Sequence, residues 1–388
     1  YRNLPAYFLY CGLPGAPMDG FGNMHDRAYM AYKDNGVGWN FGHAMCMHIA
    51  AATNDPMAKL YCAQTNVAIP MLELSAGKRL QFTTDTTLAA SLPSARQFRE
   101  IGEVAMHTHV LEPKRDMAVY FRSSPFGAFG HMHANQNAFN IAARGERVFY
   151  SSGYYTDFND RHTITSYRHT RAHNTILVSG RGQAYGTEGY GWIKRYAHGD
   201  KLTYVCGDAS KAYVPVVDKN WSKTVDQFLS PEERAAGFGD ARLRAFDRHL
   251  VFLRPGTVLI YDVLESEVPQ DWSFLLHTYK QPAILPGNRL DYTSLPGIHA
   301  GARVFAANDI TLQVTDQFTV DHRDKNPRYK DAENHHHASW TTKEKTKGQR
   351  FFAVIQCTDA GTQLAAVDNR GGGEFRIGDF TVKAALNP

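Results

Sequence analysis

The sequence of 388 residues contains no apolar run that approaches the ~20 residues a helix needs to span a bilayer. It has no dense run of lysine and arginine, and its formal net charge at pH 7 is only +4. We therefore expect neither a membrane span nor a nucleic-acid partner. The mild excess of positive charge does suit an anionic ligand.

Cysteine is also scarce, with five residues and no CxxC pair. This spacing gives no support to a zinc ribbon or to a dithiol redox site. The odd number allows two disulfides at most, and we expect buried free thiols instead. The chain opens on YRNLPAYFLY, without an initiator methionine or a signal peptide, which is typical of a fragment or a processed chain.

The first quarter of the chain carries alanine, methionine and leucine at roughly helical spacing. The candidate helices cover residues 25–36, 42–54 and 55–66, and the last begins with an Asp-Pro start signal. Glycine-rich linkers separate them. We expect a small helical domain over residues 1–97.

From about residue 98 the pattern changes to short β-branched or aromatic runs, separated by glycine, proline and aspartate. The candidate strands lie at 116–123, 138–145, 173–180, 249–266, 272–279, 310–316 and 350–357. The run at 249–266 contains RPGTVLI, which is a hairpin signal. Residues 287–301 and 321–349 are expected to form long loops. Many short strands without intervening helices predict a large antiparallel β-sandwich over residues 98–388, so the fold class is α+β.

Chemically distinctive residues concentrate in three segments: GHMHANQNAF (130–139), RGERVFYSSGYY (144–155) and YRHTRAHNTILVSGRGQ (167–183). His131 and His133 lie two apart, and in an extended segment that spacing turns both imidazoles to the same side. A single histidine is more often a structural residue. Arginine, however, matches carboxylate geometry, and histidine and tyrosine handle protons near neutral pH. The clustering therefore favours a site for an acidic ligand.

The same segments resemble the motifs of the heparinase II/III-like polysaccharide lyases, a family that includes oligoalginate lyases. The family pattern is H-x-H-x-D-x-x-x-F, then G-E-x-x-x-x-D-S-G-Y-Y, then R-x-H-N-T-x-x-V-x-G-x-x-Q. This sequence has HMHANQNAF, GERVFYSSGYY and RAHNTILVSGRGQ. The resemblance covers residues 98–280 and implies that the helical domain is the end of an α/α toroid, followed by the sandwich. It also implies that the rest of the toroid, with the principal base, lies outside this chain, on another polypeptide or in a truncated part.

The resemblance implies cleavage of a uronate-containing polysaccharide or oligosaccharide by β-elimination, with alginate or oligoalginate as the expected substrate. A glycosaminoglycan is the alternative substrate. A uronyl epimerase and a non-catalytic carbohydrate-binding sandwich are the alternative functions. Family members act on extracellular polymers or imported oligosaccharides, so a secreted or periplasmic location is expected.

The resemblance assigns one role, and the residue types suggest the others. His131 is assigned to the active site, and Tyr167 is expected to be a second active-site tyrosine, with a core aromatic as the alternative. Arg171 is expected to hold a substrate carboxylate. Asn135 and Gln183 are expected as further substrate contacts, although Gln183 could simply close its strand.

The resemblance further implies one structural zinc ion, whose ligands map to His133, His173 and Ser151. Position 151 is aspartate in the family, and a neutral serine is a poor zinc ligand. Asp157 or Asp160 could replace it. The alternative is a hydrogen-bonded His133–His173 pair that braces two strands.

Two further features are weaker indications of a site. The HHH run at 335–337 is a potential metal tract, but it is expected in a polar loop far from the three motif segments. Asp19 and His25 flank a glycine-rich loop that resembles one lining the family's cleft.

Overall fold

The structure is a computed structural model that describes residues 3–13, 15–23, 41–65, 82–323 and 329–387. In the described part of the N-terminal segment, four helices precede the sheets: α1 (Leu4–Cys11), α3 (Phe41–Thr53), α4 (Pro56–Thr65) and α6 (Thr86–Ser91). The Asp55 carboxylate accepts a hydrogen bond of 2.8 Å from the Ala58 amide, which satisfies a free donor in the first turn of α4. The helices expected over 42–54 and 55–66 are thus present, α1 was missed, and residues 25–36 lie outside the described residues.

After α6, the strands of the described residues form four sheets, and each of their pairs is antiparallel. The first sheet has the order β1 (Ala95–Phe98), β2 (Glu103–His107), β3 (Met117–Arg122), β4 (Ala138–Ala143), β5 (Glu146–Phe149). The largest has the order β12 (Ala283–Leu285), β13 (Arg289–Tyr292), β14 (Ile298–Ala306), β17 (Thr346–Asp359), β10 (Thr257–Gln270), β9 (Leu243–Leu253), β8 (Leu202–Asp208), β7 (Trp192–His198). The third has the order β15 (Ile310–Thr315), β16 (His336–Thr342), β11 (Trp272–Thr278), β6 (Ile176–Val178). The last has the order β18 (Val367–Gly371), β19 (Glu374–Ile377), β20 (Phe380–Lys383).

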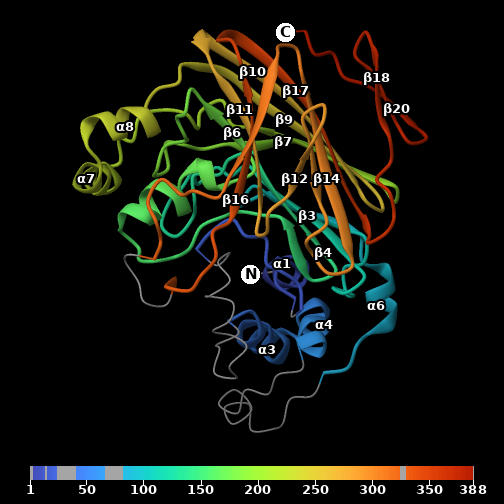
Figure 1. Ribbon diagram of the computed structural model, residues 1–388. Helices are drawn as coiled ribbons and strands as arrows, with labels where there is room; N and C mark the ends of the chain where they lie inside the picture. The colour runs from blue at the N-terminus through green and yellow to red at the C-terminus, as the bar shows by residue number, and fades with distance from the viewer. Residues whose placement is uncertain (1–2, 14, 24–40, 66–81, 324–328, 388) are drawn as a thin grey trace.

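The main core lies between the eight-stranded sheet on one side and the five- and four-stranded sheets on the other. Phe252 of β9 and Ile355 of β17 belong to the same buried cluster as Val119 of β3 and Phe274 of β11. Figure 1 shows the long strands β9, β10 and β17 running together through the upper part of the molecule. This arrangement is the sandwich that the sequence predicted.

The five-stranded sheet is buried on both faces because the helical segment covers the face turned away from the sandwich. Along β3, Val119 and Phe121 point into the main core, whereas Ala118 and Tyr120 join the cluster formed with the helices. Successive side chains of a strand point to opposite faces, so this alternation places one sheet between two cores. Figure 1 shows α1, α3 and α4 gathered at the end of the molecule below this sheet.

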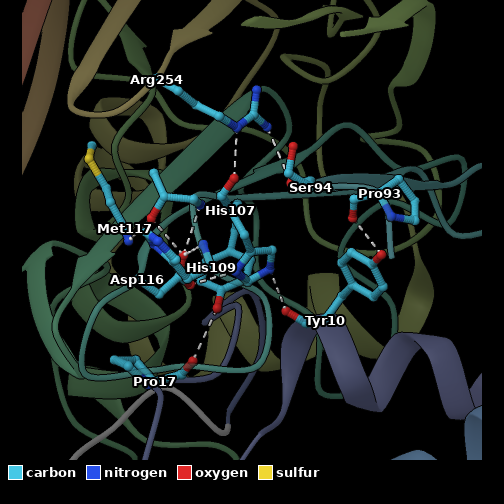
Figure 2. Close-up of polar contacts among 11 residues, drawn as sticks. Tyr10, Pro17, Pro93, Ser94, His107, His109, Asp116, Met117 and Arg254 are labelled. Atoms are coloured by element: carbon cyan, nitrogen blue, oxygen red, sulfur yellow. Dashed lines mark hydrogen bonds and ion pairs between the residues drawn. The ribbon is translucent and has the colours of Figure 1, made fainter. Parts of the chain in front are cut away.

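A buried polar network fastens α1 to the five-stranded sheet (Figure 2). The His107 ring lies 2.6 Å from the Asp116 carboxylate through Nδ1 and donates through Nε2 to the Tyr10 carbonyl at 2.9 Å. The other Asp116 oxygen accepts from the Thr108 and His109 amides, at 2.9 and 2.8 Å. Burial alone would raise the pKa of Asp116, but His107 and these amides outweigh it and hold that pKa below its usual range.

Among the described residues two α-helices interrupt the strands, contrary to the expectation of strands without intervening helices. They are α7 (Lys219–Phe228) and α8 (Pro231–Gly237), and they follow one another between β8 and β9. Asp218 caps the first, and Ser230 with Glu233 forms a capping box on the second. These capping residues are a sequence signal for helix starts that the strand-based interpretation passed over.

The predictions of two long loops were also wrong in part. Residues 287–301 contain β13 and the start of β14, and residues 321–349 contain β16 and the start of β17. In each case glycine, proline and charge suggested a loop, but sheet pairing recruited the polar residues on the exposed side of the strands. The hairpin predicted at RPGTVLI is present, as the turn between β9 and β10.

All five cysteines are free and buried, as the scattered spacing predicted. Within the described part of the chain, no helix is long and apolar enough to cross a membrane.

Candidate functional site

His131 and His133 lie in an irregular segment just before β4, and not on a strand as the spacing suggested. Residues 21–23 run alongside this segment, through a bridge between Gly22 and Met132 and a hydrogen bond of 3.2 Å from the Asn23 amide to the His131 carbonyl. Both imidazoles nevertheless reach the same side chain, that of Asn23. His131 is exposed, whereas His133 is fully buried.

The Asn23 amide joins the two histidines. Its Nδ2 lies 2.7 Å from His131 Nδ1, and its Oδ1 lies 2.8 Å from His133 Nε2. Asn23 is buried, with 5% of its surface exposed, although it comes from the loop after α1, 108 residues before His131. The sequence interpretation singled out Asp19 and His25 in this loop and missed Asn23. No local signal identifies it, because its partners are distant in the chain.

His173 continues the row of side chains on the other side of His133. Its Nε2 lies 3.2 Å from His133 Nδ1, and its Nδ1 lies 2.9 Å from the Ser151 hydroxyl. The Ser151 amide in turn donates to Asn140 Oδ1 at 2.9 Å. The three motif segments are therefore brought together, and His133 and His173 make the hydrogen-bonded contact that the sequence offered as the alternative to a metal site, although neither residue lies on a strand.

Arg168 fixes the backbone that carries His131. Its guanidinium donates to the carbonyls of Gly130 and Met132, the residues on either side of His131, the latter at 2.9 Å. The same cation lies over the Trp221 ring, 4.3 Å from its centroid. Burial lowers the pKa of Arg168 to about 10, so it remains charged at neutral pH. A buried cation thus holds the exposed histidine in place.

Tyr167 lies inside this arrangement. It ends a π-helix at Thr163–Tyr167, a helix type that often occurs at functional sites. Its hydroxyl donates to the Asn23 carbonyl at 2.8 Å, and its ring contacts His133 edge-on, with centroids 4.6 Å apart. The side chain is fully buried. Tyr167 therefore supports the Asn23 loop, and its catalytic role stays a prediction.

Steric constraints explain why the S-G-Y-Y motif has glycine at position 153. Gly153 has a φ of +89°, and a Cβ there would lie 3.0 Å from the Tyr167 Cα. Only glycine combines that backbone conformation with such a close approach.

The three predicted substrate contacts have protein partners. Asn135 is fully buried, donates to the Phe21 carbonyl at 2.9 Å and accepts from Arg122. Gln183 is fully buried and pairs with both the amide and the carbonyl of Gln136, at 2.6 and 2.9 Å. A sugar could reach either amide only if these bonds broke. Their role in substrate binding stays a prediction that this geometry does not favour.

Arg171 is less buried than these two amides. Its Nε donates to His169 Nδ1 at 3.1 Å, and its Nη1 donates to the Thr319 hydroxyl. Burial lowers its pKa below the usual arginine range. It lines a cavity of about 180 Å³ whose lining includes neither His131 nor His133. Its contact with a substrate carboxylate also stays a prediction.

The residues present do not fit the zinc ion that the resemblance implies. The Ser151 hydroxyl lies on Nδ1 of His173, whereas it is Nε2 of His173 that faces His133, so the three groups do not converge on one point. Asp160 contacts Thr156 and Thr163 instead. Across the described residues, no group of three or more histidine, cysteine or acidic side chains is arranged to hold a metal ion.

The HHH run does not lie in a polar loop far from the motifs, which corrects that expectation. His336 and His337 begin β16, which pairs with β11. His335 Nδ1 accepts from the Gly153 amide at 3.0 Å, and its ring stacks on Tyr279, with centroids 4.1 Å apart. Strand pairing thus brings these histidines against the S-G-Y-Y segment. Asp19 accepts from the Tyr7 hydroxyl at 2.6 Å in the interior, and His25 lies outside the described residues.

Comparisons with known proteins identify the family and the fold. A family model described as "Heparinase II/III-like, C-terminal" matches residues 90–363. The heparan sulfate lyase HepC from Pedobacter heparinus superposes with a TM-score of 0.63 at 14% identity, over 96% of this chain and 50% of that one. A heparinase III structure superposes with a TM-score of 0.63 at 13% identity, over 98% of this chain and 53% of that one. No curated protein sequence matches the chain.

At these identities the two structures show a shared fold, and the chain spans about half of their length. They confirm the predicted fold class, with helices followed by an antiparallel sandwich. The division at residues 97 and 98 stays a prediction. Because the family model covers well over half of the sequence, this chain belongs to the heparinase II/III-like family through its C-terminal domain.

Proposed function

We propose that this chain is the sandwich half of a polysaccharide lyase that cleaves a uronate-containing polysaccharide by β-elimination. The observation that supports the proposal most directly is the setting of His131, whose imidazole is exposed. Asn23 contacts its Nδ1, and buried Arg168 donates hydrogen bonds to the backbone carbonyls on either side of it. A rigid backbone that presents one polar group to solvent is what a preorganised site needs.

The chemistry suits a histidine that contacts the substrate carboxylate. In a uronate the C5 proton is α to the carboxylate, so neutralising that carboxylate stabilises the negative charge that develops when a base removes the proton. The electrons of the broken C5–H bond are shared with the carboxylate, and they form the C4=C5 double bond as the C4–O bond breaks. The departing oxygen keeps the electron pair of the C4–O bond and takes a proton from an acid. In this proposal the base and the acid come from the toroid half.

Two candidate substrates are each supported by a different line of evidence. Alginate or oligoalginate follows from the motif resemblance, whereas a heparan sulfate-type glycosaminoglycan follows from the similarity to the heparan sulfate lyase structure. Both polymers carry the uronate on which this chemistry depends. A secreted or periplasmic location fits either polymer and belongs to the same proposal.

The test is the ultraviolet absorbance of the unsaturated uronate product. The chain alone and the complete protein with its toroid would be incubated with alginate, heparan sulfate and chondroitin. We expect a rise with the complete protein on one polymer and none with the chain alone, because the base lies in the toroid half. His131→Ala should abolish the rise. The matched control is His198→Ala, on the edge strand β7, and it should leave the rate unchanged.

Other outcomes would replace this proposal. A flat trace with every polymer, accompanied by measurable binding, would indicate a carbohydrate-binding sandwich. Exchange of the C5 proton without an absorbing product would indicate a uronyl epimerase.

A further inference from the structure

An unbroken row of hydrogen bonds connects buried Ser151 with exposed His131. The row runs from Ser151 Oγ through both nitrogens of His173 and both nitrogens of His133 to the Asn23 amide, and then to His131 Nδ1. Its four contacts measure 2.9, 3.2, 2.8 and 2.7 Å. Ser151, His173 and His133 are fully buried, so solvent does not compete for the two contacts among them.

The Asn23 amide gives the row a direction. Its Oδ1 only accepts, so His133 Nε2 must carry a hydrogen. Its Nδ2 only donates, so His131 Nδ1 must accept. A neutral imidazole has one donor and one acceptor nitrogen, which leaves Nε2–H as the remaining polar group of the His131 ring.

The same logic continues into the interior. Since His133 donates through Nε2, its Nδ1 accepts, and His173 Nε2 must be the donor across the 3.2 Å contact. In a neutral His173 ring Nδ1 is then the acceptor, so the Ser151 hydroxyl donates across the 2.9 Å contact, which is shorter than its 3.3 Å contact with Asn140 Oδ1. A serine can donate here, whereas an ionised aspartate could only accept and would require the opposite tautomer of His173. Serine at position 151 is therefore consistent with the direction that Asn23 sets and with the poor fit to a metal.

We propose that Asn23 is the positioning residue of this site, which holds His131 as the Nε2–H tautomer. In that form the ring donates a hydrogen bond to the substrate carboxylate and does not act as the base. This role deepens the proposed function and rests on it. The tautomer itself belongs to the chain and can be measured without any activity.

The first experiment records the nitrogen NMR spectrum of the chain with ¹⁵N-labelled histidine, above pH 8, where imidazoles are neutral. We expect the Nε2–H tautomer for His131, His133 and His173. An Nδ1–H tautomer at His131 would overturn the proposal. This measurement uses the wild-type chain, so it decides the question even if a variant fails to fold.

The second experiment changes the amide. In Asn23→Asp, both carboxylate oxygens accept, so His131 should switch to Nδ1–H while His133 keeps Nε2–H. The matched control is Asn308→Asp, because the Asn308 amide donates to Gln349 Oε1, outside the histidine row. An unchanged His131 tautomer in a folded Asn23→Asp protein would overturn the proposal.

The third experiment measures the complete protein with the polymer that the wild type cleaves. Asn23→Asp should lower kcat by about 10²–10³-fold, the usual cost of removing one charge-stabilising donor. Wild-type kcat in this variant would overturn the catalytic use of Asn23 even if the lyase activity is confirmed. If the complete wild type cleaves no polymer, the proposed function fails and the catalytic use of Asn23 fails with it. The tautomer spectra still decide separately whether Asn23 sets the state of His131.

Discussion

Asp262→Asn should destabilise the sandwich by about 3–5 kcal/mol, because it would leave a buried guanidinium without its counter-charge. Asp262 and Arg248 face each other on β10 and β9, and both side chains are fully buried. The pair is bidentate, with Nε–Oδ1 and Nη2–Oδ2 distances of 2.7 Å. Arginine cannot lose its proton in this setting, so the uncompensated charge would persist in the variant.

The same arginine ties the sandwich to the site. Its Nη1 donates to the Asn137 carbonyl at 2.8 Å and to the Asn174 carbonyl at 2.9 Å. Asn174 directly follows His173, and Asn137 lies in the motif segment of His133. We therefore expect Asp262→Asn to loosen the histidine row as well as to lower stability.

Urea unfolding followed by circular dichroism measures the effect, with the slope checked against the wild type. The matched control is Asp359→Asn, in a surface pair with Arg144 whose side chains are 67% and 42% exposed, and it should cost less than about 1 kcal/mol. Replacing both buried partners, as Arg248→Met with Asp262→Leu, should recover part of the loss. Full recovery is not expected, because two carbonyls lose their donor. A loss below about 1 kcal/mol in Asp262→Asn would refute the reasoning.

Three further predictions concern other parts of the chain. The pKa of Asp116 is lowered, so its contribution to stability is present above about pH 4 and is lost as the pH falls through the lowered value. Asp116→Asn should remove this pH-dependent contribution to the free energy of unfolding, which we expect to be about 1.5–3 kcal/mol. Urea titrations of the wild type and the variant at pH 7 and pH 3 measure it, and an unchanged pH dependence in the variant would contradict the prediction. Dialysis against a chelator should leave the melting temperature unchanged, because the described residues contain no group of three or more histidine, cysteine or acidic side chains arranged to hold a metal ion, and a clear drop would indicate a bound metal. Ser230→Ala should cost about 1 kcal/mol and speed amide exchange at the start of α8, and unaltered exchange would contradict the capping-box role.

Local sequence patterns were sufficient for the family and for the long core strands β9, β10 and β17, but not for β13, β14 and β16, which were expected as loops. Alternating apolar residues and turn signals identify antiparallel strands because side chains along a strand alternate between faces. The motif order around His131 and His173 identified the heparinase II/III-like family, which the family model confirms. The hairpin signal at RPGTVLI even implies that Arg248 lies opposite Asp262, since a turn centred near residue 255 pairs them.

The sequence by itself therefore determined the sandwich and the residues of the motifs, because these depend on short periodic patterns. Only the tertiary structure decided what the motif residues contact. Asn23 contacts His131, although the two residues are 108 positions apart in the sequence. The Ser151 hydroxyl contacts Nδ1 of His173, the ring nitrogen that does not face His133. Such contacts depend on how separate segments pack, and no local pattern records which donor will face which acceptor after folding.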